Sequence, residues 1–596
     1  MTERPFVRSG NVAIFVYWSK EDSLEPNTIR YVAELLKVAN TVLFVSNSLL
    51  KPQDVFKLRK MGADFLQRVN RGFDFWGWKE GIEYLKEQIK LAENLILCNS
   101  SCFLAFSSLR QLLEKMDNKA DFWGVSSFRD RASAFHLQSY FLVFKRTMLE
   151  DWDAFFSFWN NLPKMHKWRD AVELGELKLT QFYLSKGFNC REIASCCSLP
   201  SDDVNPSFYY PVELFQAGSP FLKKKIFFED YLLFLSKSCG ETPRMAMNYV
   251  HDNGGFYSEI LQELIKNLTP SQLIRKLNLN YIINGIKLKD NSLSDKRVAV
   301  ICFVFYEDLI DYVSSILIRF DKIAKIYIVS SKKDLLVLYK NKLTNKLEES
   351  EYRLQQNRGR NEAAYFITCK DIWQEFDYVC ALHDKKTKHV TPALQGIEFM
   401  KHCEKNLCPS AASIAEIVDI FEQNPLLGLL VPPLPFFGNF ISSVFNPIGR
   451  NQRSLALLNE KLFAGKLFSG SQLDVFSAPF GGMFWARTKA LEPLSSSPLS
   501  INDFPQEPLK SSDGTILHAF ERVYPLVTRK AGFYTARVFN IFQVSLQYTN
   551  LLFFCVGLTK KQILIFKLKN SLKILLSRYP RLYDWARVIL NKITLR

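Results

Sequence analysis

The sequence predicts an α/β protein in which one unit, built around a mostly parallel sheet, is used twice. Apolar strands alternate with amphipathic helices in residues 12–188, and the alternation starts again at residue 295. The tripeptide Asn-Arg-Gly follows an expected strand in both stretches, at residues 70–72 and 357–359. Hydrophobic residues make up 47% of the 596 residues, which is enough for large cores.

The elements of the first half alternate regularly. Strand 12–19 is a continuous apolar run, as expected for a parallel strand buried on both faces. Helix 51–62 opens with Pro and closes with Gly, which are typical start and stop signals. The other expected strands are 41–47, 64–70, 93–101, 121–128 and 138–149, and the other expected helices are 27–39, 75–90, 107–116 and 170–188.

Residues 201–294 lack strand alternation and predict a helical linker region. The pattern then returns, with a strand and a helix in 295–317 and a helix at 513–525. Further strands are expected at 324–331, 377–388, 425–433 and 480–487. The expected parts are a first α/β domain (1–200), the linker (201–294), a second α/β domain (295–540) and a C-terminal tail (541–596).

The two Asn-Arg-Gly turns are candidate ligand sites. In open α/β sheets, ligands bind at the carboxyl ends of the strands, where these turns are expected. Glycine tolerates a positive φ and a close backbone approach, and arginine can bind a phosphate through two hydrogen bonds. A plain strand-to-helix turn is the alternative, but two copies in matching positions favour a ligand role.

A second pair of strand ends carries polar residues. The first half has Asn99-Ser100-Ser101, and the second half has His383-Asp384-Lys385. A site that transfers a sugar from a nucleoside diphosphate needs positive charge here, because the leaving group accumulates negative charge. Asp384 could hold Mg²⁺ or Mn²⁺, or lysines could replace the metal; a solvated basic loop is the alternative. The sequence establishes no cofactor.

Carboxylates on later segments are candidate general bases, because an inverting sugar transfer needs one to take the acceptor hydroxyl proton. The candidates are Glu173 and Glu176 in the first half and Asp513 and Glu507 in the second. A single glutamate on a helix surface is more often simply solvated. In the stretch FGGMFWAR (480–487), Trp485 suits an aromatic platform for a sugar or a base, with a core position as the alternative.

The net charge, the cysteines and the targeting signals indicate the partners and the location of the protein. The net charge of +17 favours an anionic partner: nucleic acid, an anionic membrane surface or a phosphorylated small molecule. The twelve cysteines lack metal-ligand spacing and indicate reduced thiols in a cytosolic protein. Neither a signal peptide nor a good transmembrane helix is expected. We therefore predict a cytoplasmic protein that lies at a membrane.

The segment 559–596 differs from the rest of the chain. It holds ten Lys or Arg residues and a single acid, Asp584, and leucines line one face of its expected helix. Basic amphipathic helices lie in membrane interfaces. The tail therefore predicts binding to the anionic inner face of the plasma membrane, with packing on the second domain as the alternative.

Seven stretches together resemble the rhamnan synthesis F family of bacterial polysaccharide glycosyltransferases. They are NRGFDFWGWKEGI (70–82), HLQSYFLVFKR (136–146), PFLKKKIFFEDY (220–231), NRGRNEAAYF (357–366), DYVCALHDKKTKH (377–389), FGGMFWAR (480–487) and DGTILHAFERVYP (513–525). The resemblance implies two domains of the GT-A type, the fold of nucleotide-sugar transferases. It also implies transfer of L-rhamnose or a related sugar from a dTDP-sugar to a lipid-linked glycan.

The resemblance also implies site residues. In the first half, those facing the nucleotide are Tyr17, Trp18, Asn70, Gly72, Asp74, Asn99 and Ser101. In the second half they are Tyr306, Asn357, Gly359, His383, Asp384 and Lys385, and the family's acidic helix motif falls on Asp513, His518, Glu521 and Arg522. The first half departs from the family at Ser100, where an Asp is common, which puts metal binding by that half in doubt.

Several alternatives stay open at this stage. Both halves catalyse, or one catalyses and the other binds the acceptor glycan; Asp384 and Asp513 favour the second half as the active one. A non-catalytic scaffold in glycan assembly is a rival class. A nucleic-acid-binding protein is less favoured, because the sequence has no nucleic-acid-binding motif and its excess charge is concentrated in the tail.

Overall fold

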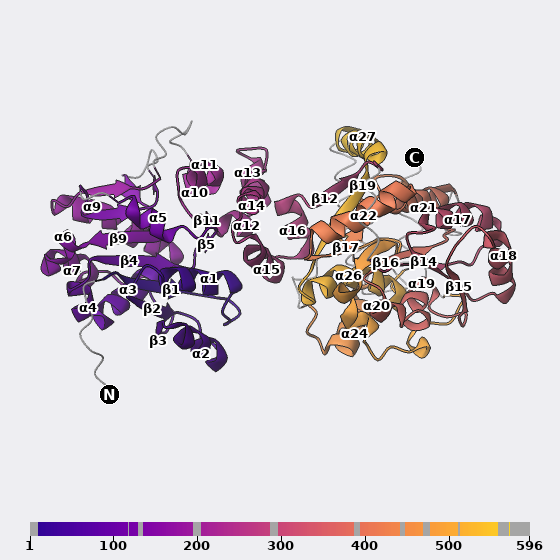
Figure 1. The fold of residues 1–596 in the computed structure, drawn as a ribbon, viewed down its shortest axis with the longest axis horizontal. Helices are drawn as coiled ribbons and strands as arrows, with labels where there is room; N and C mark the ends of the chain where they lie inside the picture. The colour runs from indigo at the N-terminus through magenta and orange to yellow at the C-terminus, as the bar shows by residue number, and fades with distance from the viewer. Residues whose placement is uncertain are drawn as a thin grey trace. The chain divides into compact units, whose positions relative to one another are not determined.

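The computed structural model describes residues 10–116, 119–128, 135–194, 204–286, 296–386, 392, 394–440, 448–468, 477–509, 513–557 and 571. The chain divides into two compact units, Met1–Leu264 and Ile265–Arg596 (Figure 1). Each unit has its own central sheet. The segment 559–596, predicted to bind a membrane, lies outside the described residues apart from residue 571.

A seven-stranded sheet organises the first unit, in the order β10-β6-β9-β4-β1-β2-β3. Its strands are β1 (Val12–Tyr17), β2 (Thr41–Ser46), β3 (Asp64–Gln67), β4 (Asn94–Asn99), β6 (Phe122–Gly124), β9 (Phe141–Lys145) and β10 (Cys190–Glu192). The pairs are parallel except those of β9, which is antiparallel to β4 and β6. The prediction of a mostly parallel sheet is confirmed for this half.

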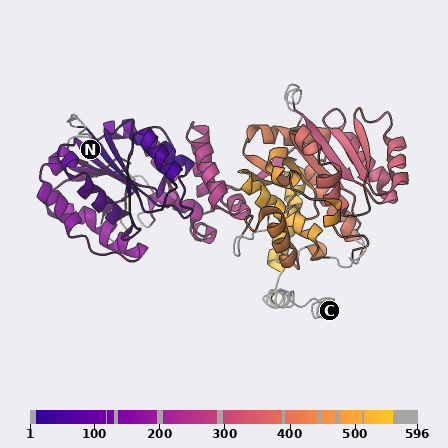
Figure 2. The same ribbon diagram turned by 90° about the horizontal axis from the view of Figure 1, so that it is seen from below.

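Helices cover both faces of this sheet (Figure 2). One core is formed with α1 (Pro26–Leu35), α2 (Pro52–Met61) and α5 (Leu109–Glu114), and the other with α3 (Phe73–Tyr84), α7 (Trp152–Asn160) and α9 (Leu177–Ser185). Alternate residues of β1 join different cores: Ala13, Phe15 and Tyr17 on one face, and Val12, Ile14 and Val16 on the other. Burial on both faces is why this strand is a continuous apolar run.

The second unit is built on an eight-stranded sheet, in the order β12-β19-β17-β18-β16-β13-β14-β15. Its strands are β12 (Asn280–Ile283), β13 (Val298–Phe303), β14 (Lys325–Ser330), β15 (Ser350–Leu354), β16 (Tyr378–His383), β17 (Leu427–Val431), β18 (Phe484–Arg487) and β19 (Tyr534–Asn540). Only β18 runs antiparallel to its neighbours among these strands. Its longer helices are α17 (Ile310–Leu317), α18 (Lys333–Leu343), α21 (Leu394–Leu407), α22 (Ala411–Gln423), α24 (Gln452–Phe463), α26 (Ile516–Lys530) and α27 (Ile541–Gly557).

The two sheets share one topology. Read from β3 and β15, the orders are β3-β2-β1-β4-β9-β6-β10 and β15-β14-β13-β16-β18-β17-β19. The antiparallel strand is fifth in both, and in both it follows its sixth-position neighbour in the sequence. The second sheet adds β12 beside β19. The two sheets therefore repeat one strand order with the antiparallel strand in the same position.

The two Asn-Arg-Gly turns have the same backbone conformation. Gly72 and Gly359 have φ values of 73° and 78°, and the residues after them, Phe73 and Arg360, have φ values of 55° and 46°. Each glycine lies directly before a helix, α3 in the first unit and α19 (Arg360–Ala363) in the second. Each turn thus places two consecutive residues in the left-handed region, which glycine adopts without strain.

We expect Gly72→Ala to lower the free energy of unfolding by about 2 kcal/mol or more. A Cβ at Gly72 would lie 2.2 Å from Cδ1 of Trp76, whose indole N–H donates to the carbonyl of Pro163 at 3.0 Å. Gly187→Ala is the matched control, because Gly187 has a φ of 89° and nothing within 4 Å of the new Cβ. Gly187→Ala should lower the free energy of unfolding by about 1 kcal/mol, the cost of placing an alanine in the left-handed region. Equal losses in urea denaturation would show that the Trp76 contact is unimportant.

The described residues 204–286 of the predicted linker are mainly helical, and two short strands lie within them. Helices α10 (Pro206–Tyr209), α11 (Pro211–Gln216), α12 (Lys225–Phe228), α13 (Tyr231–Leu235), α14 (Thr242–Asp252), α15 (Tyr257–Asn267) and α16 (Pro270–Leu277) account for most of it. Strand β11 (Phe221–Lys223) pairs with β5 (Cys102–Leu104) of the first unit, and β12 extends the second sheet. No helix within the described ranges combines the length and apolar composition needed to cross a bilayer.

Candidate functional site

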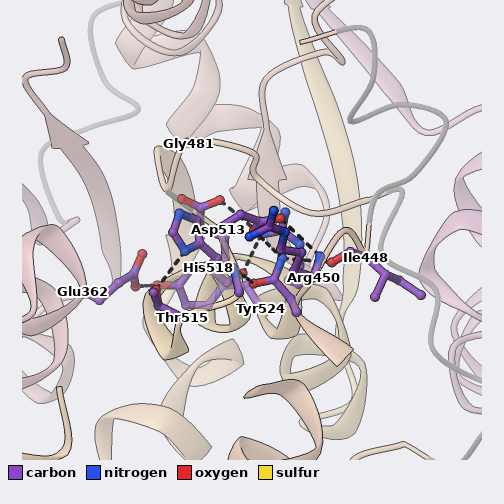
Figure 3. A network of polar contacts seen from close by, with 12 residues as sticks. Glu362, Ile448, Arg450, Gly481, Asp513, Thr515, His518 and Tyr524 are labelled. Atoms are coloured by element: carbon purple, nitrogen blue, oxygen red, sulfur yellow. Dashed lines mark hydrogen bonds and ion pairs between the residues drawn. The ribbon is translucent and has the colours of Figure 1, made fainter. Parts of the chain in front are cut away.

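A polar cluster in the second unit gathers residues that are far apart in the sequence. It includes the end of β16, the glycine pair before β18, and the segment that enters α26 (Figure 3). His518 interacts electrostatically with Glu521, Asp513, Arg522 and Lys385, and His383 with Lys385 and Glu521. Six residues predicted from the sequence therefore lie in one cluster: His383, Lys385, Asp513, His518, Glu521 and Arg522.

Asp513 is held in place by hydrogen bonds from a neighbouring loop. Asn451 Nδ2 donates to its Oδ1 at 2.7 Å, and the backbone N–H of Arg450 donates to its Oδ2 at 3.2 Å. Burial would raise the pKa of this carboxyl, but the nearby charges of Arg522 and His518 and these hydrogen bonds hold it below its ordinary value. Asp513 is therefore ionised at neutral pH.

The first turns of α26 supply a histidine and an arginine. His518 Nδ1 lies 2.8 Å from the hydroxyl of Thr515, and burial lowers the pKa of the imidazole. The Arg522 guanidinium donates to the carbonyl of His518 at 2.6 Å and lies 3.6 Å from Glu521. With only 9% of its side chain exposed, Arg522 is a buried cation between two carboxylates, Glu521 and Asp513.

The end of β16 brings His383 and Lys385 to the cluster. The two His383 ring nitrogens face the carbonyl oxygens of Asp384, at 2.8 Å, and Gly481, and the one N–H of a neutral imidazole can donate to only one of them. Burial and the nearby Lys385 lower the pKa of His383 to about 4. The Lys385 ammonium lies 4.7 Å from the ring centroid of Phe399. The strand end therefore presents a neutral imidazole and an ammonium group.

Asp384 is buried, and its two oxygens differ. Oδ2 accepts from the backbone N–H groups of Phe305 and Tyr306, at 2.7 Å each, whereas Oδ1 is buried without a hydrogen-bond partner. Burial raises the pKa of Asp384 to about 6. The pKa of an Asp in an unfolded chain is about 3.9. Between that pH and about pH 6 the native state binds more protons than the unfolded state, so the free energy of unfolding falls as the pH rises.

We expect Asp384→Asn to become more stable than the wild type as pH rises. The amide resembles the protonated acid, so the two proteins should have similar free energies of unfolding at pH 4. Above pH 6 the variant avoids an ionised buried carboxylate and should gain about 2–3 kcal/mol. Urea denaturation in EDTA across this range measures the difference. A difference that does not vary with pH would contradict the raised pKa.

The structure adds one acidic residue, Glu362, that sequence reasoning missed. Glu362, on α19, accepts from the Tyr524 hydroxyl and from Asn361 Nδ2 at 3.0 Å. Burial and the nearby Glu521 raise the pKa of Glu362 well above its ordinary value. A Cβ at Gly482 would lie 2.6 Å from Asn361 Nδ2, which explains a glycine at this point of the loop.

Other predicted residues of the second unit lie in different surroundings. Glu507 accepts two hydrogen bonds from Arg360, at 2.6 and 3.1 Å, and so ties its loop to the Asn-Arg-Gly turn. Asn357 is exposed, and Gly359 begins α19. Tyr306 donates its backbone N–H to Asp384. Trp485 is fully buried, with its indole N–H bonded to the carbonyl of Leu407 at 2.9 Å, so its ring faces are covered by the core.

A second polar cluster lies in the first unit, at the end of β4. Asn99 Nδ2 donates to Asp74 Oδ2 at 2.9 Å, and Asn99 Oδ1 accepts from the backbone N–H of Ser101 at 3.0 Å. The Lys223 ammonium, contributed by β11, donates to Ser101 Oγ at 3.1 Å. Glu176 interacts electrostatically with Asp74, and burial raises the pKa of Asp74 to about 6. Four predicted residues, Asp74, Asn99, Ser101 and Glu176, therefore lie together.

The remaining predicted residues of the first unit have varied positions. Tyr17 is buried, and its hydroxyl donates to the carbonyl of Ser23 at 2.6 Å. Trp18 is 54% exposed, and its backbone N–H donates to Ser100 Oγ at 3.2 Å. Asn70 is exposed, and Gly72 forms the turn described above. Glu173 lies on the surface in an ion pair with Arg169 at 2.6 Å.

The residues present do not form a metal cage. Within the part of the chain that the structure describes, no three His, Cys, Asp or Glu side chains are grouped as metal ligands. Asp384 offers one unpartnered oxygen, which is buried, and positive charge near it comes from Lys332. A lone carboxylate does not fit the six oxygen ligands that Mg²⁺ requires unless substrate and water supply the rest.

The protein consists of two units that share one α/β topology, and each unit has a polar cluster at the end of a strand. The rhamnan synthesis protein F family matches residues 42–533, which is most of the chain. The chain belongs to this family, and the resemblance predicted from the sequence is confirmed.

Curated relatives match the chain over shorter stretches. The protein y4gN of Sinorhizobium fredii is 27% identical over 185 residues, covering 30% of this chain and 47% of y4gN. WxcX of Xanthomonas campestris is 29% identical over 180 residues, covering 30% and 24% of the two chains. The virulence protein VirA of Vibrio anguillarum is 25% identical over 185 residues, covering 30% and 56%. The chain thus spans about half or less of the length of these relatives.

Solved structures give weaker similarities. The glycosyltransferase GlyE of Streptococcus pneumoniae is 13% identical, with 66% of this chain and 90% of GlyE covered and a TM-score of 0.25. A 4-diphosphocytidyl-2C-methyl-D-erythritol synthase is 12% identical, with 35% and 100% covered and a TM-score of 0.23. Scores at this level do not indicate a shared overall fold, and no functional conclusion follows from them.

Proposed function

We propose that the protein is a glycosyltransferase of bacterial surface-polysaccharide synthesis and that its second unit is catalytic. The observation that carries this proposal is the cluster in which Asp513 and Glu521 lie with Lys385 and Arg522. Sugar transfer from a nucleoside diphosphate needs a base for the acceptor and positive charge for the leaving group, and this cluster holds both. Membership of the rhamnan synthesis protein F family supports the polysaccharide context.

The proposed reaction is a single displacement. Asp513 accepts the proton of an acceptor hydroxyl, and the acceptor oxygen forms a bond to the anomeric carbon. The bond between that carbon and the diphosphate oxygen breaks, and the electron pair leaves with the diphosphate. Lys385 and Arg522 stabilise the charge that develops there. Because the described residues form no metal cage, no step is assigned to a metal.

The donor and the fold type follow from family membership as proposals. A dTDP-activated L-rhamnose or a related deoxysugar is the proposed donor, and a lipid-linked glycan is the proposed acceptor. Each unit is proposed to be a GT-A-type domain, and the duplicated, mostly parallel sheet with one antiparallel strand supports this. The parts proposed from the sequence remain 1–200, 201–294, 295–540 and 541–596.

We also propose that the protein lies at the inner face of the plasma membrane. Helix α27 contains no charged residue, and Phe542 and Phe553 on it are each 79% exposed. Large exposed apolar groups on one helix mark an interaction surface. The chain that follows is rich in lysine and arginine, which anionic lipids attract. A lipid-linked acceptor would be found at the same surface.

Incubation of the full-length protein with labelled dTDP-sugars and a lipid-linked glycan tests the proposed function. We expect label in the lipid fraction with one donor and none with that donor's free sugar. No transfer with any dTDP-sugar, by a protein that is folded, would instead favour a scaffold in glycan assembly.

A further inference from the structure

We infer that the first unit binds a neutral sugar chain at the ends of β1 and β4, and that this chain is the acceptor glycan. The inference rests on the proposed function, because it assigns the acceptor to a unit distinct from the proposed catalytic one. It is carried by the polar cluster around Asp74 and by the exposed Trp18 beside it.

The cluster occupies the place in the first unit that the proposed catalytic cluster occupies in the second. The backbone N–H of Ser100 donates to the carbonyl of Val16 at 3.0 Å, as that of Asp384 does to Phe303 at 3.1 Å. These bonds make Asn99–Ser101 the counterpart of His383–Lys385. Asp74, two residues after the glycine of its turn, is the counterpart of Asn361. The same position is thus used twice, with different side chains.

The two clusters differ in the charged side chains that they contain. Lys223 is the ammonium group of the first cluster, and two carboxylates, Asp74 and Glu176, interact electrostatically with each other beside it. In the second unit, Lys385 and Arg522 both reach the cluster, and Asn361 replaces Asp74. A diphosphate would add negative charge beside Asp74 and Glu176, where the cations are Lys223 and Arg68, and Arg68 is already paired with Glu80 at 2.8 Å. A ligand without charge fits the charge balance of the first cluster better than a diphosphate does.

Both carboxylates have an oxygen available for a ligand. Asp74 Oδ2 accepts from Asn99, and Glu176 Oε2 accepts from the backbone N–H of Ser139 at 2.9 Å. The other oxygen of each group, Asp74 Oδ1 and Glu176 Oε1, accepts no hydrogen bond from the described residues. Carboxylate oxygens are strong acceptors, and the hydroxyl groups of a sugar are donors that would satisfy them.

Trp18 adds an exposed aromatic side chain on a residue whose backbone bonds to this strand end. It follows the last residue of β1, and its backbone N–H bonds to the side chain of Ser100, which lies between Asn99 and Ser101. Its side chain is 54% exposed. A tryptophan with an exposed ring keeps a large apolar surface in water, and the apolar face of a sugar ring can cover it. An exposed aromatic ring beside several fixed polar groups is the composition of a small-ligand site.

Titration of the full-length protein with a rhamnose oligosaccharide that carries neither lipid nor phosphate tests this inference. Isothermal calorimetry without donor measures its affinity for the wild type, Trp18→Ala and Glu176→Gln. We expect both variants to bind the oligosaccharide about tenfold more weakly or worse. Tyr84→Ala is the matched control, because Tyr84 is 60% exposed at the opposite end of α3 from Asp74. It should bind like the wild type.

A parallel titration with dTDP separates the other outcomes. Unchanged dTDP affinity in Trp18→Ala and Glu176→Gln supports the inference, whereas weakened dTDP binding in both would assign a nucleotide to the first unit and overturn it. Oligosaccharide binding that is absent, or that is equal in wild type and variants, would also overturn it. The proposed function fails separately, if a wild type that binds the oligosaccharide through Trp18 transfers no sugar from any donor.

Discussion

Replacing Asp513 by Asn should lower the rate of sugar transfer by a factor of about 10²–10⁴. The amide keeps the size and the oxygen of the carboxylate, but it cannot accept a proton at neutral pH. Asn451 Nδ2 donates to Asp513 Oδ1 at 2.7 Å, and an asparagine oxygen in that place can accept the same bond. The variant loses the bond from the Arg450 backbone to Oδ2, at 3.2 Å, but keeps the one from Asn451, so it should fold and lose catalysis, as single-turnover transfer from the donor would show.

Glu173→Gln is the matched control for this experiment. Glu173 was also a candidate base on sequence grounds, but it lies on the surface of the first unit in an ion pair with Arg169. Its loss should leave transfer within about twofold of the wild type, since exposed ion pairs contribute little. If Asp513→Asn turns over at the wild-type rate, Asp513 is not the base. The next carboxylate of the cluster, Glu521, would then be the one to replace.

The α/β class and the duplication could be predicted from the sequence because they depend on local periodicity. Strand β1 is apolar at every position because both of its faces are buried, and this is visible in six consecutive residues. The left-handed turns are visible because only glycine adopts them readily. The direction of β9 and β18 could not be predicted, since a short apolar run has the same composition in a parallel or an antiparallel ladder.

Parts of the two clusters were missed for similar physical reasons. Glu362 lies between the polar Asn-Arg-Gly turn and the apolar residues that follow it, and no local pattern marks it as a buried acid. Lys223 reaches Ser101 from a strand in a region that was expected to be helical, and no local pattern links residues so far apart. Trp485 shows the opposite case. Its strand is paired on both sides and covered on both faces, which an aromatic residue in a short strand does not reveal.

Arg522→Met should destabilise the second unit by about 3–5 kcal/mol. Methionine fills a similar volume but removes the cation that acts on Asp513 and Glu521, together with its hydrogen bond to the carbonyl of His518. Two carboxylates would then lie in a buried site with less compensating charge. The same loss would raise the pKa of Asp513, because Arg522 is the main charge that lowers it.

Arg169→Met provides the matched comparison, because the same side chain is removed from an ion pair in which Arg169 is 81% exposed. That change should cost less than about 1 kcal/mol. Urea denaturation of both variants measures the two losses. If the Arg522 variant lost no more than the Arg169 variant, the buried charges would not depend on Arg522. The cluster would then lack the electrostatic coupling on which the assignment of Asp513 as base depends.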